Sequence, residues 1–105
     1  MNLRDGIAEF LVSLSAERGL AANTVAAYRR DLAHYAEFLG VAEAPDPGPD
    51  LDAITPELAS EFMAALDGRN LKPGTIGRKM AAVSGLHRFL FAEEYAASDP
   101  TAGLD

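Results

Sequence analysis

The sequence predicts an all-α fold in which four helices form one domain spanning residues 1–105. Three observations support this prediction. Apolar residues recur at helical spacing in four separate segments. Glycine and proline lie between those segments. No segment alternates polar and apolar residues over a useful length, so no sheet is expected. Since 49% of the 105 residues are hydrophobic, the chain can bury a core without metal or disulfide support.

The first two helices are predicted over residues 3–18 and 24–39. Asn2 is the expected cap of the first helix, and Gly19 ends it. Asn23 is the expected cap of the second helix, and Gly40 ends it. Each helix has one apolar face: Leu3, Ile7, Phe10 and Leu14 in the first, and Val25, Tyr28, Leu32, Tyr35 and Leu39 in the second.

The stretch VAEAPDPGPDLDA follows the second helix. Its prolines and glycine between Pro45 and Pro49 exclude helix and strand there. We expect an acidic surface connector, and residues 41–52 to be the most mobile internal segment, because they have little apolar surface to bury.

The third helix is predicted to begin at Thr55-Pro56-Glu57, which combines a capping threonine, proline in the first turn and an acid near the helix N-terminus. Gly68 ends it. The fourth is predicted from near Thr75 to about Tyr95, before Asp99-Pro100. Their apolar faces are Leu58, Phe62 and Leu66, and Ile76, Met80, Val83, His87 and Leu90.

The formal net charge of −7 is unusual for a protein that binds nucleic acid. Residues 41–67 contain seven acids and no base, whereas Arg29-Arg30 and Arg78-Lys79 with Arg88 form two basic clusters. Because the charges are segregated, one face can still be basic. The net negative charge nevertheless predicts weak DNA binding by the isolated chain. The chain has no cysteine, no apolar run long enough for a membrane span and no signal peptide, so a cytoplasmic location is expected.

No residue pattern indicates catalysis, a metal or a cofactor. His34 and His87 lack ligand-like neighbours, and His87 lies on an apolar face, which favours a buried structural role. Asp31 and Glu37 are expected to be solvated charges on a helix surface. The bases and small residues of the second and fourth helices have two interpretations, an ordinary solvated face or a face that approaches phosphates.

The stretch GLAANTVAAYRRDLAHYAEFLG, residues 19–40, resembles the opening signature of Xer-type tyrosine recombinases and phage integrases. ITPELASEFMAAL and LKPGTIGRKMAAVSGLHRFLFAEEYAASDPTAGLD resemble the third and fourth helices of that family in the same order. The resemblance implies a SAM-like orthogonal bundle that serves as a core-binding domain. In this family, such a domain forms one half of a clamp around double-stranded DNA for site-specific recombination.

Carried over by position, the resemblance implies DNA contacts from the second and fourth helices, at Asn23, Thr24, Tyr28, Arg29, Arg30, Thr75, Arg78, Lys79 and Arg88. It implies that the catalytic domain follows this chain, so no catalytic residue is assigned: none of Tyr28, Tyr35 and Tyr95 matches the family's nucleophile. No cofactor or metal is implied.

Relatives carry more bases on the fourth helix, where this chain has Ala82, Ser84, Gly85 and His87. The expected partners are double-stranded DNA and other recombinase protomers, with the isolated domain monomeric and no membrane involved. A helical protein-interaction module remains the alternative, and a continuous basic face would favour DNA. The sequence leaves open the DNA site and the choice among chromosome-dimer resolution (chromosome partition), phage integration and integron-like reactions.

Overall fold

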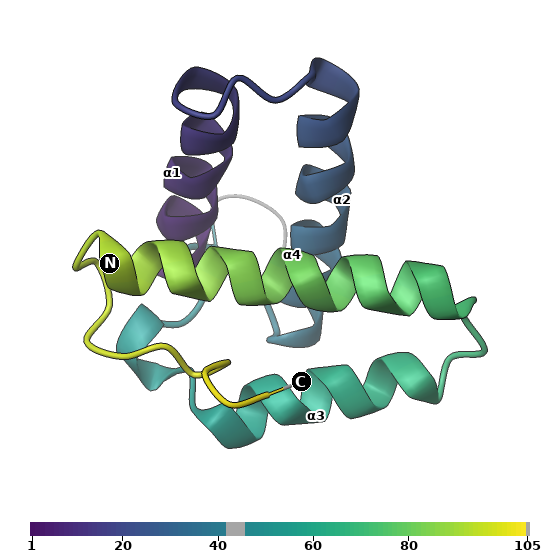
Figure 1. Ribbon diagram of the computed structural model, residues 1–105. Helices are drawn as coiled ribbons and strands as arrows, with labels where there is room; N and C mark the ends of the chain where they lie inside the picture. The colour runs from purple at the N-terminus through teal and green to yellow at the C-terminus, as the bar shows by residue number, and fades with distance from the viewer. Residues whose placement is uncertain (42–45, 105) are drawn as a thin grey trace.

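The computed structural model describes residues 1–41 and 46–104, which form four α-helices and one short 3-10 helix. The α-helices are α1 (Leu3–Ala16), α2 (Ala22–Phe38), α3 (Pro56–Asp67) and α4 (Pro73–Ala92), and the 3-10 helix η1 (Leu51–Ala53) precedes α3. Helices α1 and α2 stand side by side, α4 crosses both, and α3 runs along the opposite flank of α4 (Figure 1). The all-α orthogonal arrangement is thus confirmed. The described residues contain no strand, only one isolated bridge between Asn2 and Asp50.

Two of the helices begin at a capping side chain, as the sequence predicts. The side chain of Asn2 accepts from the backbone N–H of Asp5 at 2.8 Å, and Thr55 Oγ1 accepts from that of Leu58 at 3.1 Å. The prediction that Asn23 caps α2 is wrong, because this helix already begins at Ala22 and has no side-chain cap. The chain turns at Gly19, whose φ is +63°, and therefore re-enters helix before it reaches Asn23.

Two helices end earlier than predicted. Helix α1 stops at Ala16 rather than near Arg18. Helix α4 begins at Pro73, ahead of Thr75, and stops at Ala92 rather than near Tyr95. At that end the N–H groups of Tyr95 and Ala96 both donate to the Leu90 carbonyl, at 2.9 and 3.2 Å, and Glu94 has a φ of +62°. This left-handed closure turns the chain back, so that Ala96 is buried against the bundle.

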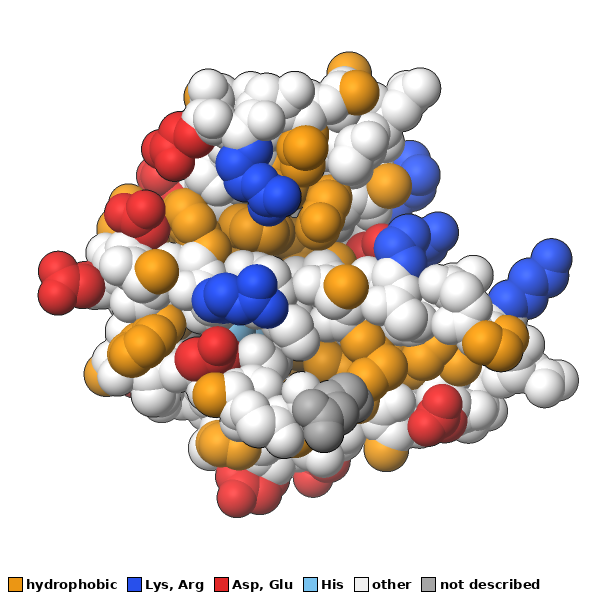
Figure 2. All heavy atoms as spheres, in the orientation of Figure 1, with side chains coloured by type: hydrophobic (Ala, Val, Ile, Leu, Met, Phe, Trp, Pro, Cys, Tyr) orange, Lys and Arg blue, Asp and Glu red, His pale blue; other side chains and the backbone are white. Residues whose placement is uncertain are grey.

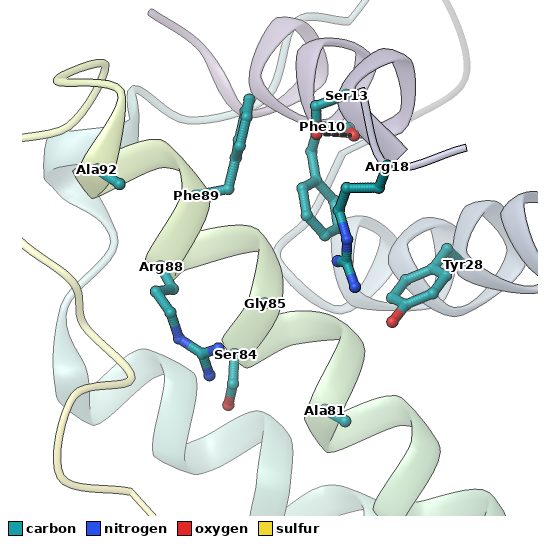
Figure 3. Close-up of a pocket in the computed structure, with 10 residues that line it drawn as sticks. All are labelled: Phe10, Ser13, Arg18, Tyr28, Ala81, Ser84, Gly85, Arg88, Phe89 and Ala92. Carbon is teal, nitrogen blue, oxygen red and sulfur yellow. Dashed lines mark hydrogen bonds between the residues drawn. The ribbon is translucent and has the colours of Figure 1, made fainter. Parts of the chain in front are cut away.

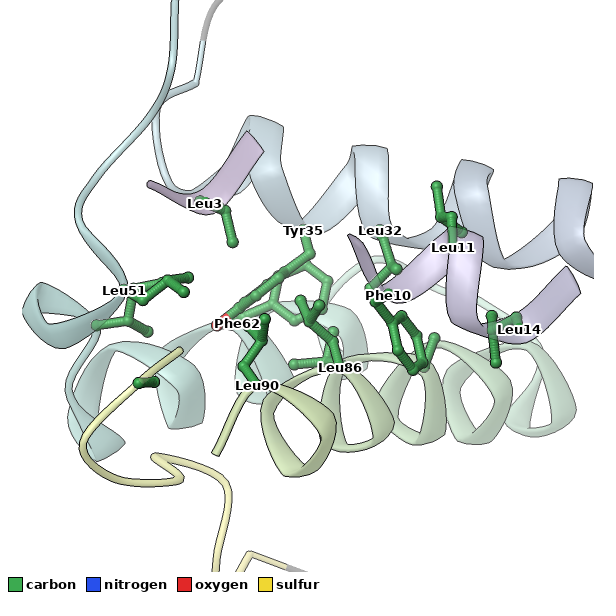
Figure 4. Packing of buried hydrophobic residues seen from close by; sticks show 14 of the residues in the cluster. Leu3, Phe10, Leu11, Leu14, Leu32, Tyr35, Leu51, Phe62, Leu86 and Leu90 are labelled. Atoms are coloured by element: carbon green, nitrogen blue, oxygen red, sulfur yellow. The ribbon is translucent and has the colours of Figure 1, made fainter. Parts of the chain in front are cut away.

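The four predicted apolar faces meet in one core, which Figure 4 shows from close by. The Phe62 ring of α3 lies against Tyr35 of α2, with centroids 5.0 Å apart. On the other side of the core, Phe10 of α1 contacts Tyr28 and Phe89, with centroids at 5.9 and 5.4 Å. Burial of each large apolar side chain contributes about 1.5–3 kcal/mol, so this core supplies most of the driving force for folding.

The acidic connector is partly anchored to the start of the chain. Pro49 and Pro47 accept from the backbone N–H groups of Leu3 and Arg4, at 2.8 and 3.1 Å, and Leu51 donates to Met1 at 2.9 Å. These bonds tie residues 47–51 to the start of the chain. The mobility of residues 41–52 stays a prediction, and residues 42–45 lie outside the described part. The sequence did not predict η1, which places Leu51 in the core.

Candidate functional site

Two adjoining hollows open on the side of α4 that faces α1 and α2. One is lined by α1, α2 and α4 and the other by α2 and α4, and they share Tyr28 and Ala81. We call this joint surface the arginine groove and define it by Arg18, Tyr28, Arg78, Ala81, Gly85 and Arg88. Because two hollows share a wall, the groove extends along α4 rather than forming a closed cavity.

Arginines stand on both sides of the groove. Figure 3 shows Arg18 reaching in from just past α1, beside the ring of Tyr28, and Arg88 reaching out from α4 next to Ser84. On this face of the molecule, Lys and Arg side chains gather over α4 and between α1 and α2. Most Asp and Glu side chains lie at the edges and over α3 (Figure 2). The local charge of the groove is therefore positive, although the chain carries −7.

Small residues form the floor of the groove along α4. Ala81 and Gly85 present little side chain there. A Cβ added to Gly85 would lie 3.5 Å from Phe10 Cζ, an ordinary contact distance, so packing does not require glycine at this position. Because Gly85 has no side chain, a ligand can approach the backbone of α4 more closely there.

Asp31 is the only acid among the described residues that line the groove, and it is fully engaged. Its carboxylate is 2% exposed and accepts a two-pronged bond from Arg78: Nε to Oδ2 at 2.9 Å and Nη2 to Oδ1 at 3.0 Å. Lys79 Nζ donates to Oδ1 at 3.0 Å. Burial by itself would raise the pKa of Asp31, but the bonds from Arg78 and Lys79 outweigh it and lower that pKa below its usual value. The expectation of a solvated Asp31 is therefore wrong.

The structure brings together four of the nine residues expected from the family resemblance. Thr24, Tyr28, Arg78 and Arg88 line the groove. Lys79 lies behind it with a side chain only 14% exposed, because its ammonium faces Asp31.

The other four expected residues do not line the groove. Asn23, Arg29 and Arg30 are exposed on α2. The groove-facing side of that helix carries Tyr28 and Asp31. Since successive residues are about 100° apart around a helix, Arg29 and Arg30 point away from that side. Thr75 is half-buried in the first turn of α4.

Arg18 is the groove residue that sequence reasoning missed. A signal for it exists, since Arg18 directly precedes Gly19, the turn that brings α2 alongside α1. In the structure, Arg18 lies just past the end of α1 and lines the hollow between α1, α2 and α4.

The two histidines lie in different environments. His87 is 2% exposed, which confirms its structural role, and its Nε2 is hydrogen-bonded to the Tyr35 hydroxyl at 2.7 Å. His34 contacts Arg69 at the surface. Within residues 1–41 and 46–104, no three potential metal-ligating side chains gather. No helix in this described part combines the length and apolar character needed to cross a bilayer.

Comparison with known proteins identifies the family to which this chain belongs. The sequence profile of the phage integrase N-terminal SAM-like domain matches residues 7–94, and the chain belongs to that family. The chain is 37% identical to tyrosine recombinase XerD of Bradyrhizobium diazoefficiens over 95 residues, covering 90% of this chain and 28% of that protein. It is 33% identical to tyrosine recombinase XerD of Staphylococcus aureus over 99 residues, covering 94% of this chain and 32% of that protein.

The chain thus spans about a third of the length of these curated relatives and corresponds to their N-terminal SAM-like domain. The catalytic domain of a recombinase is not contained in these residues. The chain matches no solved structure.

Proposed function

We propose that this domain binds double-stranded DNA through the arginine groove and serves as one arm of the clamp that a tyrosine recombinase closes on its recombination site. The whole protein would carry out site-specific strand exchange, such as chromosome-dimer resolution or integration, with further protomers as partners. One observation carries the proposal. Three arginines border a groove whose floor consists of small residues, and the one acid among its described lining residues is already paired.

The chemistry of the groove suits a phosphate backbone. Guanidinium groups donate forked hydrogen bonds that match phosphate oxygens, and they hold their charge at every physiological pH. Ala81 and Gly85 would let the backbone of α4 come close to a duplex, with Arg88 and Arg78 beside them to meet its phosphates. Phosphate contacts of this kind set the position of the protein on DNA, while base-edge contacts set sequence preference.

The salt dependence of DNA affinity tests the proposal. Residues 1–105 are titrated onto a fluorescently labelled duplex of mixed sequence, and anisotropy is measured at several salt concentrations. Arg88→Gln and Arg18→Gln should each weaken binding and reduce the slope of log affinity against log salt by roughly 0.9, the value for one lost phosphate contact.

Arg69→Gln is the matched control, because it removes the same charge from an arginine in the α3–α4 link outside the groove. It should leave the salt slope nearly unchanged. Equal effects of Arg69→Gln and Arg88→Gln, or no binding by the parent chain at low salt, would overturn the proposal. Amide shifts that map to α3 on addition of a protein partner would instead favour the protein-interaction function.

A further inference from the structure

We propose that Asp31 is a positioning residue, which holds Arg78 in the orientation that a DNA phosphate meets in the arginine groove. This inference rests on the proposed function of the groove. Asp31 would then favour the binding of DNA, although its negative charge alone would oppose it.

The geometry of the ion pair carries the inference. Arg78 donates Nε–H and one Nη2–H to the two carboxylate oxygens of Asp31, at 2.9 and 3.0 Å. A planar two-pronged pair fixes the guanidinium in both direction and tilt, which a single bond does not. The remaining N–H groups of Arg78 are left for another acceptor, and its side chain is 56% exposed. One edge of the Arg78 guanidinium is therefore bound to Asp31, and its other donors are available to a phosphate.

The surroundings of Asp31 keep its carboxylate in place, so that it fixes the orientation of Arg78. With 2% of its side chain exposed, the carboxylate cannot swing out to follow a mobile arginine. Lys79 donates a third hydrogen bond to the carboxylate, so Asp31 remains charged and fixed even when Arg78 turns part of its donors to a phosphate. The three groups together carry one net positive charge, and only the guanidinium of Arg78 is largely open to solvent.

Pre-organisation has a measurable consequence for DNA affinity. A free arginine on a helix surface loses rotamer freedom when it binds a phosphate, and an arginine that is already fixed loses much less. Asp31→Asn keeps the size of the side chain but weakens its hold on Arg78. If charge alone mattered, removing an acid from a DNA-binding face would raise affinity. If Asp31 positions Arg78, affinity should fall by between about twofold and tenfold, the range expected for immobilising one long side chain.

The experiment compares DNA affinity across a double-mutant cycle in residues 1–105, using the same labelled duplex at fixed salt. The cycle consists of the parent chain, Asp31→Asn, Arg78→Lys and the double variant. Arg78→Lys keeps the charge but loses the fork. We expect each single variant to weaken binding, and Asp31→Asn to cause no further loss once Arg78 is lysine. Asp67→Asn, the same chemical change at an exposed acid that ends α3, should leave affinity equal or slightly higher.

Two further measurements distinguish the loss of Arg78 positioning from unfolding of a variant. Thermal melts establish that each variant is folded at the assay temperature, and the NMR signal of Arg78 Nε–H reports whether its hydrogen bond is lost in Asp31→Asn. Higher affinity or unchanged affinity of folded Asp31→Asn would overturn the positioning role, while the Arg88→Gln result would still support the groove. If neither Arg88→Gln nor Asp31→Asn changes binding, the groove itself is not the DNA site, and both proposals fail.

Discussion

Acidification to pH 5 should destabilise this domain through one buried imidazole. His87 is 2% exposed, and its Nε2 shares a hydrogen bond of 2.7 Å with the Tyr35 hydroxyl. Burial lowers the pKa of His87 to about 4, although the charge of Asp99 raises it in part. Burial also raises the pKa of Tyr35, so the hydroxyl stays protonated beside the imidazole. The folded domain therefore holds His87 neutral at pH 5, while the unfolded chain protonates it.

The size of the effect follows from proton linkage. Between the folded pKa of about 4 and the unfolded value of 6.5, only the unfolded state binds the extra proton. Unfolding free energy then falls by about 1.4 kcal/mol for each pH unit of acidification. This stability is fully present above pH 6.5, is lost as the pH falls toward 4, and changes little below that. From pH 7 to pH 5 the loss is about 2 kcal/mol, which lowers the melting temperature of a domain of this size by roughly 10 °C.

Urea denaturation at pH 7 and pH 5, followed by circular dichroism, measures the loss directly. His87→Gln keeps a hydrogen-bond acceptor but cannot titrate, so it should lose about 2 kcal/mol less than the parent chain over this interval. His34→Gln, at the half-buried surface histidine, should retain the loss that His87 causes. Parallel behaviour of the parent chain and His87→Gln between the two pH values would show that the imidazole is not protonated on unfolding, and the reasoning would be refuted.

Two further substitutions test how the helices are built and used. Gly85→Ala should raise the unfolding free energy by up to about 1 kcal/mol through helix propensity, because its Cβ would meet Phe10 Cζ at 3.5 Å without strain. It should also weaken DNA binding by narrowing the arginine groove; a stabilised variant with unchanged affinity would show that α4 does not approach the duplex at this point. Thr55→Ala should cost about 1 kcal/mol in urea denaturation, since it removes the bond to the Leu58 N–H. Thr24→Ala, in a helix without a side-chain cap, is the comparison, and an equal loss there would contradict the capping argument.

The helices were predictable because their signals are local. Asn2 and Thr55 cap the helices they precede, and the apolar spacing of residues such as Phe10 and Leu90 identified the buried faces before any packing was known. The errors at helix ends have a tertiary cause. Helix α4 stops at Ala92 because the following residues turn back to bury Ala96, a contact that propensity does not encode.

The site was predictable only in part because groove membership depends on how helices cross. Arg29 and Arg30 form the most conspicuous basic pair in the sequence, yet their position on α2 turns them away from α4. Arg18 was missed because it lies outside the second and fourth helices. Asp31 looked like a surface acid because its partners, Arg78 and Lys79, come from α4, 47 and 48 residues further along the chain.

The net charge of −7 argues less strongly against DNA binding than it first suggests, because charge acts over a limited distance in salt. The domain measures 33 × 31 × 29 Å, whereas the screening length is about 8 Å at physiological ionic strength. The stretch from 41 to 67 holds seven acids and no base, and its helix α3 lies on the flank of α4 opposite α2 (Figure 1). A phosphate at the arginine groove would therefore experience mainly Arg18, Arg78 and Arg88 at physiological salt. At very low salt the screening length approaches about 30 Å, so the distant acids oppose the approach of DNA as well. The acidic composition thus limits long-range attraction to nucleic acid, while contact in the groove remains governed by its own arginines.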